Sequence, residues 1–311
     1  MTGLVTLGET MGIVRTATGL EQAHDARIGV GGAESNVAIG FARLGGEATW
    51  IGRVGNDGLG RRVLREIRAE GVHTLAAIDE SAPTGLLIKE TPVPDRTRVT
   101  YYRAGNAGSR LNVADVYPAV IQAAGILHIT GITPGLSTTA SEAVDAALAA
   151  AKGTVPVSFD VNHRDGVWQG RDPKAAYIRL AERAAVVFAG DREAALLVGE
   201  AEPAELARRI AKLGAHQVVI KLGDRGSVAL IDGKLHTVPA IRVRAVDTVG
   251  AGDAFVAGYL HALLAGRPAA ERLDLATRCG AFACLGAGDW ESSPRTADLA
   301  LLDGAEDAVA R

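Results

Sequence analysis

A single aspartate, Asp253, follows a cluster of small residues and precedes a long apolar run in "VGAGDAFVAGYL". If a helix begins at these glycines, the first free backbone N–H groups belong to Gly250, Ala251, Gly252 and Asp253. Such N–H groups bind anions, and small residues let a phosphate approach the backbone. The helix dipole keeps the Asp253 carboxylate ionised, so that it can accept a proton from a hydroxyl group. The spacing predicts a general base beside an anion hole, although "GAGD" taken alone favours a plain helix cap.

The elements that must position these groups alternate along the chain. Short apolar runs, typical of strands buried on both faces, are followed by amphipathic stretches that end at a glycine. This alternation predicts a three-layer α/β/α domain with a mainly parallel sheet. The expected strands lie at 4–8, 47–55, 125–131, 155–162, 184–189, 216–223 and 227–231, and the clearest helices at 33–45, 59–71, 137–153 and 203–215.

Two segments interrupt the alternation. Residues 11–30 and 84–104 look strand-like without an intervening helix, and the second contains a proline-rich turn. We expect them to form a small β-sheet lid on an α/β core made of 1–10, 31–83 and 105–311. An ordinary surface hairpin is an equally weighted alternative. The exposed face of such a lid could pair with its copy, which predicts a homo-oligomer, a dimer through the lid or larger.

Composition narrows the class of partner. The chain of 311 residues has a formal net charge of −3, which provides no basic field for nucleic acid or an anionic membrane. A small-molecule partner is therefore expected. The two cysteines lack the spacing of a zinc site, the N-terminus does not resemble a signal peptide, and no apolar run reaches 18 residues. We therefore expect a cytoplasmic protein.

Two stretches make the sequence recognisable. "GGAESNVAIGFARLGGEATWIGRVGNDGLG" at 31–60 and "VDTVGAGDAFVAGYL" at 246–260 resemble the signature regions of the ribokinase-like (PfkB) carbohydrate kinases, and the resemblance runs over nearly the whole chain. It implies that Asp253 is the catalytic base and that the amides of 250–252 form the anion hole. It also implies that Gly31, Gly32 and Asn36 lie against the sugar.

The resemblance extends to the nucleotide side. "VVIKLGDRGSVAL" at 218–230 is similar to the strand–turn–strand beside ATP, which implies nucleotide-binding roles for Lys221, Gly223 and Gly226. The family's N-x-x-E motif, which helps to organise magnesium and phosphate, appears as "GDRE" at 190–193. The resemblance therefore implies a cofactor-binding role for Glu193, while Gly190 stands in place of asparagine.

The implied cofactors are ATP and Mg²⁺, with magnesium held mainly by phosphates and water rather than by protein ligands. Family analogy adds a monovalent cation site near Asp247 and residues 281–289. Other phosphate-binding signals compare poorly, since no P-loop occurs, "HRDGVWQG" at 163–170 lacks the asparagine of a protein-kinase loop, and no G-x-G-x-x-G follows the first strand.

The substrate side most resembles the 2-keto-3-deoxygluconate kinases, through "TYYRAGNAGSRL" at 100–111, "DVNHR" at 160–164 and "GAGDWESSP" at 286–294. The resemblance implies that Tyr101, Arg103, Arg164 and Asp289 contact the sugar acid. Two guanidinium groups suit a carboxylate, which neutral sugars lack. The alternatives are a solvated edge charge for Arg103 and a salt bridge from Arg164 to Asp160. Leu87 stands where this subfamily is expected to carry a tyrosine.

The sequence thus predicts an ATP-dependent kinase that phosphorylates a primary hydroxyl of 2-keto-3-deoxygluconate. The nearest rival is the same chemistry on fructose, ribose or another neutral sugar. A rival of another class is a sugar-acid sensor that has lost turnover, against which the intact Asp253 and its glycine cluster argue.

Overall fold

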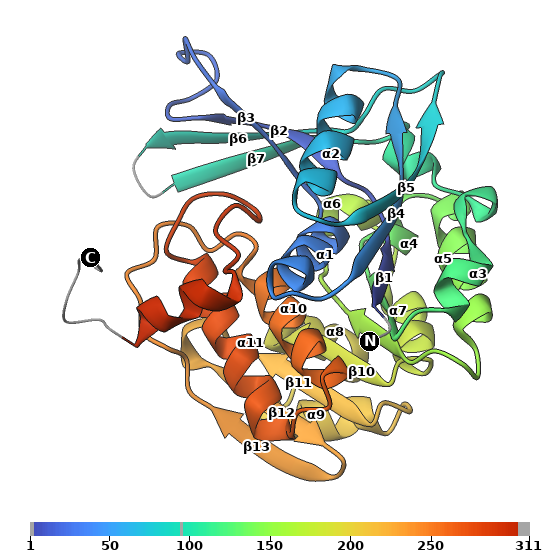
Figure 1. Cartoon of the computed structure of the whole chain (residues 1–311), viewed down its shortest axis with the longest axis vertical. Coiled ribbons are helices and arrows are strands. Elements are labelled where there is room, and N and C mark those ends of the chain that lie inside the picture. The colour runs from blue at the N-terminus through green and yellow to red at the C-terminus, as the bar shows by residue number, and fades with distance from the viewer. Residues whose placement is uncertain (1–2, 94–95, 304–311) are drawn as a thin grey trace.

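The computed structural model describes residues 3–93 and 96–303, and it has a nine-stranded sheet at its centre (Figure 1). The strand order is β13-β12-β11-β10-β9-β8-β1-β4-β5. All neighbours from β5 to β11 run parallel, and only β12 and β13 are antiparallel, which confirms the mainly parallel sheet. The strands are β1 (Leu4–Leu7), β4 (Ala48–Gly55), β5 (His73–Asp79), β8 (Ile126–Thr130), β9 (Val157–Asp160), β10 (Val186–Gly190), β11 (Gln217–Lys221), β12 (Ser227–Ile231) and β13 (Lys234–Val238).

Helices cover both faces of this sheet because successive side chains of a strand point to opposite faces. Leu4 packs into one apolar cluster with α1, α2, α10 and α11, whereas its neighbour Val5 packs into another with α5, α7, α8 and α9. The three-layer prediction is therefore confirmed. The helices are α1 (Ala33–Arg43), α2 (Gly58–Ala69), α3 (Pro118–Gln122), α4 (Thr133–Leu136), α5 (Thr138–Ala151), α6 (Asp165–Trp168), α7 (Lys174–Ala181), α8 (Asp191–Val198), α9 (Pro203–Ala211), α10 (Ala251–Leu264) and α11 (Ala269–Ala283).

Two strands, β5 and β13, were not expected from the sequence. They are the two edges of the large sheet, and most of their residues are at least partly exposed. An edge strand lacks the continuous apolar run that marks a central parallel strand, so its sequence carries little signal.

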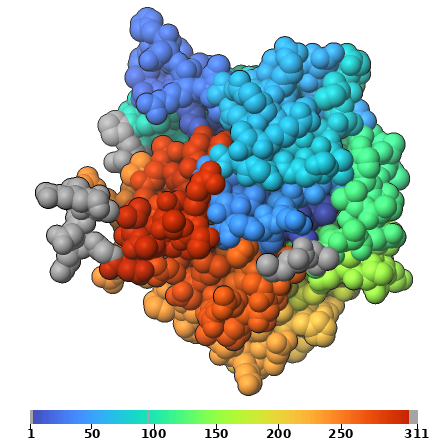
Figure 2. Space-filling view, viewed as in Figure 1, coloured from blue at the N-terminus to red at the C-terminus, as the bar shows by residue number. Residues whose placement is uncertain are grey.

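A second sheet has four strands in the order β3-β2-β6-β7. It contains β2 (Met11–Thr16), β3 (Arg27–Gly31), β6 (Leu86–Val93) and β7 (Arg96–Tyr102). The β2–β6 pair is parallel and the other two pairs are antiparallel. The β2–β3 hairpin projects at one corner of the molecule (Figure 2).

One face of the small sheet turns toward the large domain. Residues paired on adjacent strands point the same way, so Ile13, Leu87 and Tyr101 share a face, and Arg15 and Lys89 follow two residues along it. Leu87 packs with Met11 and Ile13 in a small apolar cluster. The position expected to carry a tyrosine hydroxyl is therefore filled by hydrocarbon.

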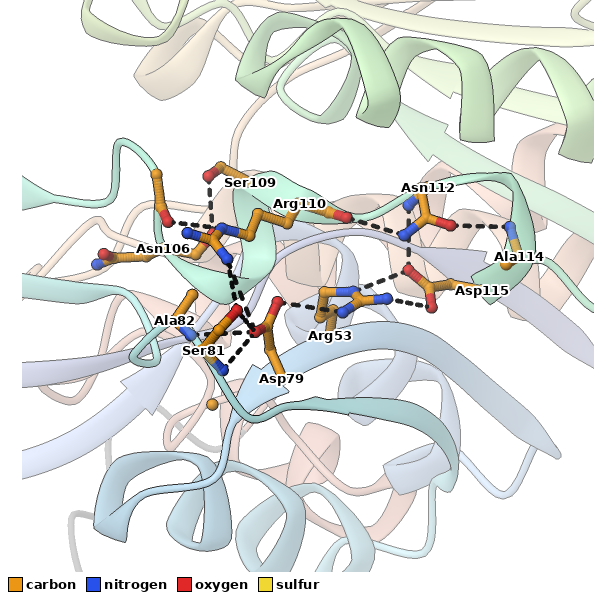
Figure 3. Close-up of polar contacts among 12 residues, drawn as sticks. Arg53, Asp79, Ser81, Ala82, Asn106, Ser109, Arg110, Asn112, Ala114 and Asp115 are labelled. Carbon is orange, nitrogen blue, oxygen red and sulfur yellow. Dashed lines mark hydrogen bonds and ion pairs between the residues drawn. The ribbon is translucent and has the colours of Figure 1, made fainter.

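An ion-pair network holds the two chain segments that connect the sheets (Figure 3). Arg53 of β4 lies 3.1 Å from Asp79 and 3.0 Å from Asp115, and Arg110 donates to Ser81 at 2.8 Å. Asp79 and Ser81 precede β6, whereas Arg110 and Asp115 follow β7. The network therefore fixes both ends of the β6–β7 hairpin to the large domain.

No helix in residues 3–93 and 96–303 is long and apolar enough to cross a membrane.

Candidate active site

Helix α10 begins where the glycine cluster predicted a helix start. Gly250 is its N-cap and has a φ of +75°, in the left-handed region that glycine tolerates best. A side chain at Gly250 would also collide with the carbonyl oxygen of Asp289. Two features therefore require glycine at this position, namely its backbone conformation and the close approach of the Asp289 carbonyl oxygen.

The N–H groups at this helix end differ in one respect from the prediction. Ala251 donates to the carbonyl of Thr248 at 3.3 Å, so its N–H belongs to the turn. For Gly250, Gly252 and Asp253, no backbone acceptor is found within residues 3–93 and 96–303. Three free amides at the positive end of a helix make an anion-binding site.

Asp253 is held by two amide side chains. Asn36 of α1 donates to its Oδ2 at 2.8 Å, and Asn162 donates to Oδ1 at 3.4 Å. Burial raises the pKa of Asp253 to about 7, with the hydrogen bond from Asn36 opposing and the charge of Asp160 adding to the rise. The helix dipole was expected to keep the carboxylate ionised, but with a pKa of about 7 the group is mostly ionised only above neutral pH. A carboxylate with this pKa suits general base catalysis near neutral pH.

Lys221 lies beside the helix end. It closes β11, and its Nζ donates to both carboxylate oxygens of Asp160, at 2.7 and 2.9 Å. A Cβ on Gly252 would stand 3.6 Å from this Nζ, so the ammonium faces the glycine turn. Asp160 therefore pairs with Lys221, not with Arg164 as the alternative reading had it. Asp160 was not predicted as a site residue, although its place at the end of a buried strand was a signal.

A cavity of about 700 Å³ opens at this point. Its lining brings together Lys221, Gly223, Gly226, Ala251 and Gly252, which come from the predicted nucleotide turn and the predicted anion hole. The φ angles of Gly223 and Gly226 are +60° and +91°, so the β11–β12 turn needs both glycines. The structure therefore places members of both predicted sets on one cavity, whereas Gly250, Asp253 and Glu193 are not among its lining residues.

Glu193 has a different set of contacts from the one the motif suggested. Its Oε2 accepts from the Gly190 N–H at 2.6 Å, and its Oε1 accepts from the His163 N–H at 2.9 Å. Both oxygens therefore hold backbone, and they fix the turn that carries Asn162 and Arg164. Within residues 3–93 and 96–303, no group of three or more histidine, cysteine, aspartate or glutamate side chains could hold a metal.

Arg103 is not a solvated edge charge. Its Nε donates to Glu9 Oε2 at 2.8 Å, its Nη2 lies 2.5 Å from the same oxygen, and its guanidinium stacks 5.4 Å from the Tyr101 ring centre. Glu9 is 2% exposed, and its Oε1 has no partner in the described part of the chain. No role for Glu9 was predicted from the sequence. A carboxylic acid directly after a buried strand was the available signal.

Arg164 remains exposed at the start of α6, and its Nη1 donates to the carbonyl of His163 at 2.8 Å. The positive charge of Arg164 acts to lower the pKa of Asp253, so the two groups are near each other. Asp289 is paired with Arg15 of β2 at 2.8 Å. Burial raises the pKa of Asp289, and the Arg15 hydrogen bond opposes the rise.

Gly31 and Gly32 were predicted to lie against the sugar, and both stand near the residues described above. A Cβ on Gly31 would meet the Asp289 carboxylate at 2.5 Å, and Gly32 is the N-cap of α1, four residues before Asn36. These contacts join Gly31, Asn36, Asp253 and Asp289 into one site. Arg103 and Tyr101 lie together at its margin, where Arg103 also acts on Glu34 of α1.

Comparison with known proteins agrees with this geometry. The profile "pfkB family carbohydrate kinase" matches residues 1–296. A 2-dehydro-3-deoxygluconokinase of Bacillus subtilis (strain 168) is 36% identical, covering 98% of this chain and 96% of that protein. The enzyme of the same name from Thermoproteus tenax is 36% identical over 88% of this chain and 85% of its own length. A 2-dehydro-3-deoxygalactonokinase of Haloferax volcanii is 32% identical over 85% of each chain.

Solved structures give the same result. A PfkB protein from Polaromonas sp. JS666 has a TM-score of 0.87 at 34% identity, covering 98% of this chain and all (100%) of that one. A fructokinase from Vibrio cholerae with fructose, ADP and potassium has a TM-score of 0.83 at 27% identity, over 97% and 98%. A putative ribokinase of E. coli with ATP and Mg²⁺, at 22% identity and a TM-score of 0.89 over 97% and 99%, shares the fold. The chain belongs to the pfkB family of carbohydrate kinases.

Proposed function

We propose that this protein transfers the γ-phosphoryl group of ATP to a primary hydroxyl of 2-keto-3-deoxygluconate, also called 2-dehydro-3-deoxygluconate, giving 2-keto-3-deoxy-6-phosphogluconate. The observation that carries the proposal is Asp253, held by Asn36 and Asn162 beside the free amides of α10 and the cavity that contains Lys221. The names of two relatives at 36% identity, both 2-dehydro-3-deoxygluconokinases, support the choice of sugar.

The residues of the site divide the chemistry between them. Asp253 orients the sugar hydroxyl and takes its proton, since the two amides fix the direction of its oxygens. The free N–H groups of Gly250 and Gly252 donate hydrogen bonds that stabilise the negative charge developing on the transferred phosphoryl group. Lys221 lines the same cavity, and although its ammonium donates to both oxygens of Asp160, its third N–H is left for a phosphate oxygen beside Gly252.

ATP and Mg²⁺ fit the residues present. The cavity of about 700 Å³ has the size of a nucleotide pocket, with Gly223 and Gly226 in a turn that leaves the backbone accessible. Both carboxylate oxygens of Glu193 accept hydrogen bonds from backbone N–H groups. Magnesium would therefore be held by phosphate oxygens and water, and it supplies charge neutralisation on the phosphates.

The choice between a sugar acid and a neutral sugar depends on the two arginines. Arg164 has no acidic partner in the described residues, so its charge is available to a substrate carboxylate. Arg103 is already neutralised by Glu9, which favours a neutral sugar as the second candidate. A sugar-acid sensor without turnover is the third, and the complete Asp253 environment argues against it.

A phosphoryl-transfer screen tests the proposal. With ATP and Mg²⁺, kcat/KM for 2-keto-3-deoxygluconate is expected to exceed that for fructose or ribose by at least ~10-fold, because a charge-assisted contact contributes about 1.5–3 kcal/mol. 2-Keto-3-deoxygalactonate belongs in the panel, given the name of one relative. Better use of fructose or ribose would replace the sugar acid by a neutral sugar, and no transfer to any sugar would favour the sensor.

We also propose that residues 11–30 and 84–104 act as a lid on a core of 1–10, 31–83 and 105–311. The separate four-stranded sheet and its charged contacts with the site loops support this division. Sugar plus nucleotide is expected to protect the amides of β2, β3, β6 and β7 from hydrogen exchange far more than nucleotide alone, because closure buries them. Equal protection in the two states would make the sheet ordinary scaffold.

A homo-oligomer joined through the small sheet is our proposal for quaternary structure. Strand β7 is an edge of that sheet, and it exposes Val99, Tyr101 and Tyr102. An edge strand with exposed apolar side chains is suited to pair with a second copy.

A cytoplasmic location remains our proposal and is supported by two unbridged cysteines, Cys279 and Cys284.

A further inference from the structure

A row of charged pairs joins the small sheet to the two loops beside the anion hole. Lys89 of β6 pairs with Asp247 at 2.6 Å, and Arg15 of β2 pairs with Asp289 at 2.8 Å and Glu291 at 3.0 Å. Lys89 and Arg15 are register partners on adjacent strands, so both cations project from the same face. Asp247 precedes α10, whereas Asp289 and Glu291 follow α11.

Asp247 organises the turn that leads into the anion hole. Its Oδ1 accepts from the Val249 N–H at 3.2 Å, and Val246 donates to the carbonyl of Cys284 at 2.8 Å. Burial acts to raise the pKa of Asp247, but the hydrogen bonds from Lys89, Val249 and Gly288 outweigh it and hold the pKa below its ordinary value. The ionised carboxylate thus ties together residues 246–250 and the loop at Gly288.

The family resemblance implies a monovalent cation at this place, and the residues present do not fit a free ion. The Lys89 ammonium already stands against the Asp247 carboxylate, and the two side chains are only 12% and 17% exposed. An ammonium group carries the same single charge as K⁺. The charge of Lys89 also acts to lower the pKa of Asp289, which lies on the neighbouring loop. The position that a cation would take beside Asp247 is therefore filled by a side chain.

We infer that the Lys89 ammonium, delivered from the small sheet, replaces a free monovalent cation beside Asp247 and positions the 246–250 turn for phosphoryl transfer. Lys89 is a positioning residue in this scheme, because it acts on the amides of Gly250 and Gly252 through Asp247. Because the pair is mostly shielded from solvent, salt screens it less than an exposed ion pair. The charge also arrives only when the small sheet lies against the core, so it couples that sheet to the anion hole.

The inference rests on the proposed kinase activity for one of its two tests. Wild-type kcat/KM with the best sugar of the panel is expected to change less than twofold when tetramethylammonium replaces K⁺, since no free cation is needed. Lys89→Met removes the ammonium but keeps the stem, and leaves Asp247 unpaired. It is expected to lose about 10- to 100-fold in tetramethylammonium, the effect of one charge-assisted contact, and to recover most of this in K⁺.

Two control variants separate this role from a simple latch. Arg15→Met breaks the neighbouring contacts with Asp289 and Glu291, so any loss that it causes should not be recovered by K⁺. Lys152→Met removes an exposed lysine at the end of α5 and should behave like the wild type. If Lys89→Met loses activity that K⁺ does not restore, or if the wild type requires K⁺, the inference is wrong.

A second test needs no activity. K⁺ is expected to raise the Tm of Lys89→Met by roughly 2 °C or more over tetramethylammonium, because it binds only the folded state, while the wild-type Tm stays unchanged. Crystals of Lys89→Met in rubidium chloride should show anomalous density beside Asp247. A protein that phosphorylates no sugar contradicts the proposed function only, and these measurements still decide on Lys89. Absence of both effects in Lys89→Met overturns the inference.

Discussion

Replacing Asp253 with asparagine is expected to lower turnover by at least ~10²-fold, the usual contribution of a positioned general base. Asparagine keeps the size of the side chain and can still meet Asn36 and Asn162, but it cannot accept a proton. Binding of nucleotide and sugar should therefore remain, which calorimetry can measure. Asp145→Asn, on the outer helix α5, is the matched control and should stay near wild-type turnover.

The pH profile gives an independent check on Asp253. Its pKa lies at about 7, so the carboxyl is protonated and inactive as a base below that pH. Wild-type kcat/KM should rise with pH and level off above about 7, because this quantity reports the free enzyme. The asparagine variant should lack this limb in whatever activity remains. Turnover within a few-fold of wild type would remove Asp253 from its role.

Stability provides the control for folding. An acid whose pKa is raised in the folded state destabilises that state as pH rises from the unfolded pKa toward the folded one. For Asp253 this interval runs from 3.8 to about 7. Asp253→Asn removes the buried charge, so above pH 7 the variant should melt no lower than the wild type. A lower Tm there would mean that lost turnover reflects damage to the fold.

The second large effect is expected at the two arginines. Arg164→Ala should raise KM for 2-keto-3-deoxygluconate about tenfold to a hundredfold and leave KM for ATP nearly unchanged, since each charge-assisted contact contributes about 1.5–3 kcal/mol. Arg164 is exposed and has no acidic partner in the described residues, so its removal breaks no ion pair there. Steady-state kinetics with both substrates measures the effect.

Arg103→Ala should act in the same direction but requires a companion variant. Its loss leaves Glu9 buried and unpaired, which destabilises the protein by itself. Arg103→Ala combined with Glu9→Gln removes that charge and isolates the effect on the sugar. Lysine at either arginine should rescue only in part, because a point charge cannot make a two-pronged contact with a carboxylate.

A neutral sugar distinguishes the roles of these arginines. The preference for 2-keto-3-deoxygluconate over fructose should shrink in the Arg164 and Arg103 variants, because fructose has no carboxylate to lose. Variants that lose both sugars alike would show that the arginines support the fold of the site. The kinase of a neutral sugar would then take the place of the sugar-acid kinase.

Sequence by itself determined the features that depend on neighbours along the chain. The start of α10 at Gly250 follows from local backbone chemistry, in which small residues precede an acid and an apolar helix. The central strands follow from apolar runs. The β11–β12 turn follows from its two glycines, which can adopt the positive φ angles that the turn requires. Each of these is set within a few residues, so the sequence pattern predicts it.

Tertiary structure alone decided the pairs. Asn36 meets Asp253 across 217 positions, Glu9 meets Arg103 across 94, and Lys221 meets Asp160 across 61. Which charges meet depends on the order of strands in the sheet, and many acids are equally available to an arginine or a lysine along the chain. The raised pKa of Asp253 has the same origin, because burial is a property of the packed domain and not of the four residues around it.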